Sequence, residues 1–193
     1  MAVFVPSEDA VYVTSNRLAD GSIKIGKAVR SSTDGSWRSE DVPTDIAMPN
    51  GGVNHGPSSV LFCAQGTRTR PGGLVLMDLH SPPSSAYATK TLVEGYHGRW
   101  FNSVNDVVVC PADGSVWFTD PVYGFEQGFR DRPQLPGQVY RFEPASGDLR
   151  VVADGLGRPN GLCFAPDGGC MYITDTDWFV GFATRSRGRM VMC

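Results

Sequence analysis

Hydrophobic and polar residues alternate along most of the chain, which is the pattern of strands rather than helices. The alternation is clearest over residues 10–15, 115–120 and 170–175, which are also rich in β-branched and aromatic residues. No stretch keeps apolar residues at positions i, i+3, i+4 and i+7 over three turns. The pattern therefore predicts an all-β fold.

The strands recur as hairpins, each consisting of a strand, a turn rich in Pro, Asp, Ser or Gly, and a second strand. The four copies are residues 3–15, 52–65, 105–120 and 160–175. Their ends lie 50, 55 and 55 residues apart. A period of about 50 residues with four strands per unit is typical of the blades of a β-propeller.

Further strand pairs between these hairpins would complete four-stranded blades. They are residues 22–25 with the segment near Trp37, 73–77 with 91–93, and 138–142 with 149–153. The chain then holds three to four blades, whereas known propellers have at least about four and often six to eight. We expect a partial propeller over residues 1–177 and a tail, 178–193, that continues no repeat and is disordered. Truncation at both ends would explain this, and a short chain that closes by oligomerising is the alternative.

Composition narrows the class of protein. The chain has 193 residues, of which 41% are hydrophobic and 19% charged, as in folded proteins. Its net charge of -3 and the lack of a basic stripe argue against nucleic acid as a partner. No apolar run suits a membrane helix, and no signal peptide or obligate protein partner is evident, so a cytoplasmic location is predicted. The five cysteines include no CxxC pair, which favours free thiols.

Two asparagines begin equivalent strands. Asn105 and Asn160 lie 55 residues apart, so the repeat places both at the same height around a propeller axis. Amide oxygens that converge there suit a hard cation such as Ca²⁺. Asparagine also caps turns through its own side-chain hydrogen bonds, and spacing alone leaves both interpretations open.

Three carboxylates occupy related positions. Asp120 and Asp175 end equivalent strands, where they either line the channel or cap the following turn. Asp120 precedes a proline, which holds its backbone extended and favours the turn. Asp106 should point away from Asn105 by strand alternation. It either reaches the channel mouth through a bend or anchors the neighbouring loop, and we expect the anchor.

Several stretches resemble a known family. Phe101–Val109 and Asp113–Gly124 resemble the central signature of the regucalcin/gluconolactonase (senescence marker protein, LRE-like) family, and Val139–Phe142, Arg158–Gly168 and Tyr172–Thr176 resemble its next blade. The resemblance is specific over residues 100–177 and weaker towards the N-terminus, where it is closest to fungal members.

This resemblance implies a six-bladed propeller with one divalent cation, Ca²⁺ or Zn²⁺, on its axis. It implies that Asn105 and Asn160 are metal ligands, and it places Ser103 on the substrate side. Asp120 and Tyr123 are further candidates for substrate binding because of their position at the end of a strand, although an aromatic residue beside a turn is more often a packing residue. In the family the cation polarises a lactone carbonyl that an activated water attacks. The implied activity is metal-dependent opening of a sugar lactone or another small lactone.

Two departures from the family pattern bear on that activity. The position of the family's first metal ligand, a glutamate, falls before Met1, and its last ligand, an aspartate that can act as the base, falls in a blade after Asp175. The expected catalytic acid therefore lies outside the chain, and two neutral amides do not offset the desolvation of a divalent ion. We expect this chain to bind metal poorly and to be impaired as a lactonase. The alternative is a non-catalytic propeller that serves as a binding or interaction module.

Overall fold

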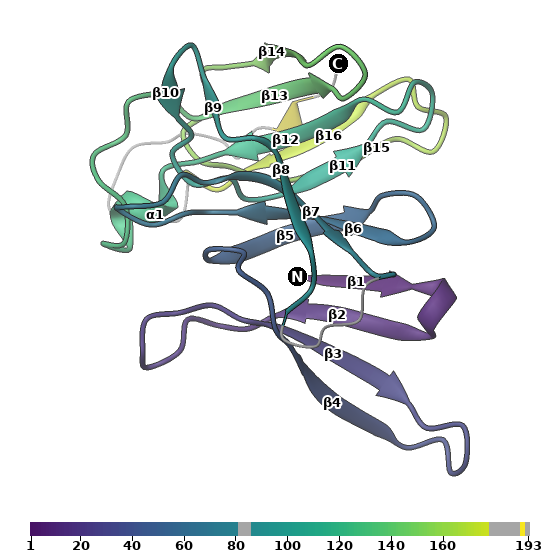
Figure 1. The fold of residues 1–193 in the computed structure, drawn as a ribbon. Helices are drawn as coiled ribbons and strands as arrows, with labels where there is room; N and C mark the ends of the chain where they lie inside the picture. The colour runs from purple at the N-terminus through teal and green to yellow at the C-terminus, as the bar shows by residue number, and fades with distance from the viewer. Residues whose placement is uncertain (81–85, 178–189, 192–193) are drawn as a thin grey trace.

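A computed structural model describes residues 1–80, 86–177 and 190–191 as a series of antiparallel sheets (Figure 1). Blade A contains β1 (Ala2–Val5), β2 (Ala10–Thr14), β3 (Ile25–Arg30) and β4 (Trp37–Val42). Blade B contains β5 (Pro49–Asn54), β6 (Ser59–Ala64), β7 (Gly73–Asp78) and β8 (Thr89–Val93). Each strand pairs with the next one along the chain, which is the meander of a propeller blade.

The second half of the chain repeats this order. Blade C contains β11 (Val107–Val109), β12 (Val116–Asp120), β13 (Gln138–Glu143) and β14 (Asp148–Ala153). Blade D contains β15 (Pro159–Phe164), β16 (Met171–Asp175) and β17 (Met190–Val191). Figure 1 shows the sheets following one another from the purple blade A to the yellow-green blade D, without closing into a ring. The predicted all-β partial propeller is confirmed.

Short elements connect strands between and within the blades. The hairpin of β9 (Gly95–Tyr96) and β10 (Arg99–Trp100) leads from blade B to blade C, and the single-turn helix α1 (Tyr123–Glu126) follows β12. A turn of 3-10 helix, Pro6–Glu8, connects β1 to β2. No helix in the described ranges is long and apolar enough to cross a membrane.

The structure shortens one predicted strand and describes only two residues of the predicted tail. The strand expected at residues 22–25 begins only at Ile25, because the backbone N–H and hydroxyl of Ser22 both donate to Asp20 Oδ1 and close a turn there. Most of the expected disordered tail, 178–193, lies outside the described residues. Its described part, β17, pairs with β16. The boundary at residue 177 stays a prediction.

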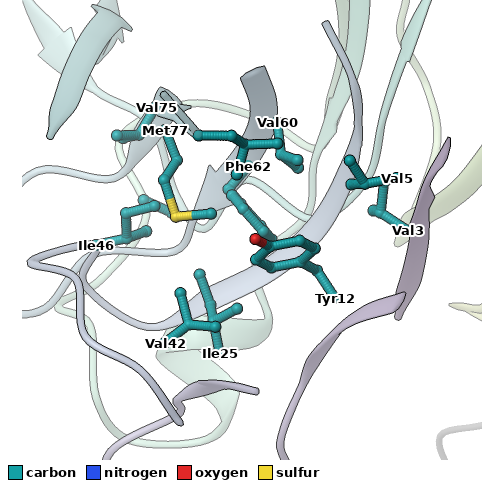
Figure 2. Close-up of a cluster of buried hydrophobic side chains, with 12 residues drawn as sticks. Val3, Val5, Tyr12, Ile25, Val42, Ile46, Val60, Phe62, Val75 and Met77 are labelled. Atoms are coloured by element: carbon teal, nitrogen blue, oxygen red, sulfur yellow. The ribbon is translucent and has the colours of Figure 1, made fainter. Parts of the chain in front are cut away.

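Hydrophobic clusters lie between successive blades. Figure 2 shows Tyr12 and Ile25 of blade A facing Phe62 and Met77 of blade B. Leu61, next to Phe62 in β6, instead joins a second cluster with blade C. Because both faces of blade B are covered, β6 is apolar at consecutive positions rather than at alternate ones. A third cluster lies between blades C and D.

The free thiols predicted from the sequence are found at each cysteine that the structure describes. These are Cys63, Cys110, Cys163 and Cys170. Cys193 lies outside the described residues.

The first strands of the blades, β1, β5, β11 and β15, neighbour one another in that order and are called the inner strands below. Each pairs antiparallel with the second strand of its blade. The beginning of every inner strand therefore lies at the same end of its sheet as the end of the second strand. We call this end of the blades the entry face, and the predicted site residues lie on it.

Candidate functional site

The two candidate metal ligands lie on neighbouring inner strands and are joined through one threonine. Asn105 stands just before β11 and is 8% exposed, and Asn160 lies in β15 and is half-buried. The Asn105 N–H donates to the carbonyl of Thr119 at 2.9 Å, and the Thr119 hydroxyl donates to the carbonyl of Asn160 at 2.7 Å. Thr119 therefore fixes the backbones of both asparagines relative to β12.

The inner strand of blade B approaches Asn105 closely. The Gly51 N–H donates to the Asn105 carbonyl oxygen at 2.7 Å. A Cβ atom on Gly51 would lie 2.3 Å from that oxygen and 2.7 Å from Asp106 Cα, which is closer than real contacts allow. Glycine is therefore required here. On the other side of blade C, a Cβ on Gly161 would meet nothing closer than the hydroxyl of Thr174 at 3.4 Å.

Asp106 anchors the inner strand of blade D rather than the neighbouring loop that the sequence predicts. Its Oδ2 accepts a hydrogen bond from the Leu162 N–H at 3.2 Å, and its own N–H donates to the Thr119 hydroxyl at 3.1 Å. Burial raises the pKa of the Asp106 carboxyl, and hydrogen bonds from the backbone N–H groups of Leu162 and Val107 oppose this shift. The carboxylate thus holds blades C and D together beside the two asparagines.

Asp120 and Asp175 anchor the loops that enter the inner strands. The two oxygens of Asp120 accept the N–H groups of residues 102 and 103 at 2.9 and 2.8 Å. The two oxygens of Asp175 accept those of residues 157 and 158, also at 2.9 and 2.8 Å. Asp120 is completely buried, whereas Asp175 is half-buried. The Asp120 carboxylate thus bonds to a loop 17–18 residues before it and not to the turn that follows it, which was one of the two interpretations left by the sequence. Asp175 makes that turn contact as well, because its Oδ1 also accepts the Asp177 N–H at 3.2 Å.

Burial has a strong effect on the acidity of Asp120. It raises the pKa of this carboxyl to about 7, against the lowering by the two N–H donors and by the positive charge of Arg130. The proton on this group therefore titrates near neutral pH in the folded chain.

Ser103 is also committed to the local backbone. It is fully buried, and its hydroxyl donates to the Pro121 carbonyl at 2.9 Å and accepts from the Gly124 N–H at 2.9 Å. These bonds hold the start of α1 against the loop before β11. The polar groups of Ser103 and Asp120 are thus already bound to the backbone. Substrate contact by either residue stays a prediction.

Tyr123 contacts the side chain of a predicted metal ligand. Asn160 Nδ2 donates to the Tyr123 hydroxyl at 3.0 Å, and this hydroxyl also bonds to the hydroxyl of Thr176. The Thr176 hydroxyl donates in turn to the Arg158 carbonyl at 3.4 Å. No hydrogen bond within the described ranges involves the carboxamide of Asn105 or the carboxamide oxygen of Asn160.

Asn50 is a third asparagine of the same repeat, which the sequence-based prediction did not include. Asn50 lies 55 residues before Asn105, and Pro49-Asn50-Gly51 repeats Pro159-Asn160-Gly161. It lies in β5 on the entry face and is half-buried. Extending the spacing one blade towards the N-terminus would have found it.

A buried arginine that the sequence analysis did not single out joins blades B and C on this face. Arg130 is 7% exposed and donates to four backbone carbonyls, of Thr67, Arg70, Phe101 and Asn102, at 2.5–2.9 Å. Its guanidinium also lies over the Trp100 ring, 5.8 Å from the centroid. It lines a pocket of about 150 Å³.

These residues fit only part of a cation site. The amide oxygens of Asn105 and Asn160 are ligands that Ca²⁺ accepts, but both are neutral. Over the described ranges there is no group of three or more His, Cys, Asp or Glu side chains that could hold a metal ion. Two neutral amide oxygens alone do not offset the desolvation of a divalent cation.

The blades identify the chain as part of a β-propeller. Asn105 and Asn160 place on its entry face carboxamide groups, which can bind a cation. Residues 55–185 match the family model described as the SMP-30/gluconolactonase/LRE-like region. The chain belongs to this family, as the sequence resemblance predicted. The match extends to residue 185 and so includes part of the segment after residue 177.

The similar proteins include lactone hydrolases. The chain is 36% identical over 132 residues to lactonohydrolase oryL of Aspergillus oryzae. This aligned region covers 60% of this chain and 30% of that protein. It is 37% identical over 90 residues to a gluconolactonase of Zymomonas mobilis, covering 45% of this chain and 24% of that protein. The chain thus spans less than a third of each of these two relatives.

Solved structures give the same class of fold. The gluconolactonase XC5397 from Xanthomonas campestris superposes with a TM-score of 0.74 at 26% identity, over 100% of this chain and 60% of that one. The periplasmic gluconolactonase PpgL of Pseudomonas aeruginosa superposes with a TM-score of 0.54 at 16% identity, over 100% of this chain and 55% of that one, and at this identity supports the fold alone.

Proposed function

We propose that this chain supplies the Asn105 and Asn160 side of a lactone-hydrolase site that opens a sugar lactone or another small cyclic ester. One observation carries the proposal: neighbouring inner strands, joined through Thr119, hold two asparagines whose carboxamide oxygens have no hydrogen-bond partner in the described part of the chain. Membership of the family and the similarity to lactonohydrolase oryL and to gluconolactonases support the substrate class.

The residues of this chain contribute binding and orientation. Asn105 and Asn160 would hold a divalent cation, Ca²⁺ or Zn²⁺, through their amide oxygens. When bound, the cation supplies Lewis-acid polarisation of the lactone carbonyl. Thr119 fixes the two backbones relative to each other, and Asp106 ties the inner strands of blades C and D together.

We further propose that the chain alone is a weak catalyst, because its two assigned ligands carry no charge. Proton release from glucono-δ-lactone, measured by pH-stat with and without Ca²⁺ or Zn²⁺, tests the function. We expect a slow metal-dependent rate that disappears in the double variant Asn105→Ala, Asn160→Ala. The variant Asn16→Ala, in an exposed loop, is the matched control and should keep the full rate.

A metal-dependent rate that survives the double substitution would contradict the assignment of the two asparagines. The second candidate function is a propeller that binds a ligand without catalysis. It is favoured by the lack of a cluster of three metal-ligating side chains among the described residues. A chain that binds cation and lactone but gives no rate above the uncatalysed one would establish that alternative. The predicted cytoplasmic location stays a proposal.

A further inference from the structure

A series of hydrogen bonds, called the relay below, leads from the side chain of Asn160 through two hydroxyl groups to a backbone carbonyl. Asn160 Nδ2, the Tyr123 hydroxyl, the Thr176 hydroxyl and the Arg158 carbonyl oxygen follow one another in hydrogen-bonding contact. Asn160 lies in β15 of blade D and Thr176 directly follows β16 of the same blade, whereas Tyr123 is the first residue of α1, in the loop between β12 and β13 of blade C. The relay therefore crosses the boundary between the two blades.

The last group gives this relay a direction. A backbone carbonyl accepts hydrogen bonds and cannot donate them, so the Thr176 hydroxyl must use its proton on Arg158. Thr176 then accepts the proton of Tyr123, and the Tyr123 oxygen is left to accept from Asn160. This order requires the amino group of the Asn160 carboxamide to face Tyr123. Its oxygen is turned away from Tyr123 and is left free.

Other contacts hold Tyr123 in place independently of this relay. Arg158 Nη2 and Glu126 Oε1, at the C-terminal end of α1, form an ion pair of 2.7 Å between blade D and the helix. At the other end of α1, the Gly124 N–H donates to the buried hydroxyl of Ser103. The tyrosine ring is thus carried on an element that is fixed to both blades.

We infer that Tyr123 is a positioning residue, which uses its hydroxyl and that of Thr176 to orient Asn160 with its carboxamide oxygen free for a ligand. The ligand class is a hard cation or a hydroxyl group, both of which an amide oxygen binds. The inference deepens the proposed function and rests on it for the identity of that ligand. Asn105 has no corresponding tether in the described part of the chain, so orientation is imposed on one asparagine of the pair.

The test observes the side-chain amide of Asn160 directly by ¹⁵N NMR of the full chain. In Tyr123→Phe, which removes only the hydroxyl, exchange of the Asn160 Nδ2 protons with water should accelerate about fivefold, as expected for the loss of one ordinary hydrogen bond. Tyr172→Phe is the matched control, because the hydroxyl of this half-buried tyrosine in β16 makes no hydrogen bond in the described part of the chain. It should leave the exchange unchanged.

Thr176 provides a rescue experiment. Thr176→Val removes the acceptor that directs the Tyr123 proton, so Tyr123 becomes able to donate to a reversed carboxamide, and the Asn160 amide signals should shift. Thr176→Ser retains the hydroxyl and should restore the wild-type shifts and exchange rate. Unchanged shifts and exchange in both Tyr123→Phe and Thr176→Val would overturn the inference.

Mn²⁺ as a probe separates this inference from the proposed function. The concentration that half-broadens the Asn160 amide should rise about three- to tenfold in Tyr123→Phe, because a ligand that is competent for only part of the time binds correspondingly more weakly. A wild-type chain in which Mn²⁺ broadens neither asparagine would contradict the cation site, and the amide exchange would still decide the role of Tyr123. Equal broadening in wild type and variant would contradict the positioning role.

Discussion

Blades C and D carry the same anchor at the entry face, in different surroundings. In each blade the second strand ends in an aspartate whose two oxygens accept consecutive N–H groups of the entering loop, at the same distances. Asp120 of blade C is completely buried beside Arg130, whereas Asp175 of blade D is half-buried. The repeat thus sets the same hydrogen bonds in both blades, and we expect the difference in burial to set how much each anchor stabilises the fold.

Removal of the two anchors should break the symmetry between the blades most strongly. Asp120→Ala leaves two buried N–H groups without partners, so we expect a loss of about 3–5 kcal/mol in the free energy of unfolding. Asp175→Ala should cost only about 1 kcal/mol, because water can reach the groups it releases. Urea unfolding of both variants measures the difference, and equal losses would contradict the role assigned to burial.

Gly51 in β5 and Gly161 in β15 lie on the inner strands on either side of blade C and differ in how closely they approach it. Gly51→Ala places a Cβ 2.3 Å from the Asn105 carbonyl oxygen and should cost about 2–3 kcal/mol by overpacking. In Gly161→Ala the new Cβ meets nothing closer than the Thr174 hydroxyl at 3.4 Å, and the substitution should cost less than about 1 kcal/mol. Thermal unfolding with near-UV circular dichroism compares the two, and a larger loss for Gly161→Ala would contradict the geometry.

The raised pKa of Asp120 gives blade C a pH-dependent contribution to stability. The folded-state pKa of this carboxyl, about 7, lies above the unfolded value, so the folded state holds the proton more tightly. The stability that this provides is fully present below about pH 4 and is lost as the pH rises through about 7, by up to about 1.4 kcal/mol per pH unit.

Urea unfolding of wild type and Asp120→Asn between pH 4 and 8 isolates this contribution, since asparagine does not titrate. The difference in unfolding free energy between the two chains should change by about 4 kcal/mol over this range. A pH dependence that persists in Asp120→Asn would assign it to other groups, such as Asp106.

Much of the fold followed from the sequence because a propeller blade is a local structure. Hairpins such as β11–β12 and β15–β16 have short turns between alternating strands, so their positions and their 55-residue spacing are visible in the chain. The shift of β3 shows where this fails, since the turn at Ser22 depends on a side-chain hydrogen bond to Asp20. The continuous apolar run of β6 has meaning only when both neighbouring blades are present.

The candidate site was less predictable because its contacts join distant segments. Arg130 binds carbonyls of the loop at Thr67 and Arg70, about 60 residues earlier, and nothing in its local sequence indicates this. Tyr123 and Asn160 meet across a blade boundary. The burial of Asp120 was equally hidden, since the residues before Asp120 and Asp175 read alike as strands.

The most direct test of the central claim, that Asn105 and Asn160 form one cation-binding pair, is a Mn²⁺ titration of the ¹⁵N-labelled chain. The side-chain amides of both residues should broaden together, with the same half-effect concentration, while exposed asparagines such as Asn16 remain sharp. Broadening of one without the other, or broadening that follows exposed carboxylates instead, would contradict the account.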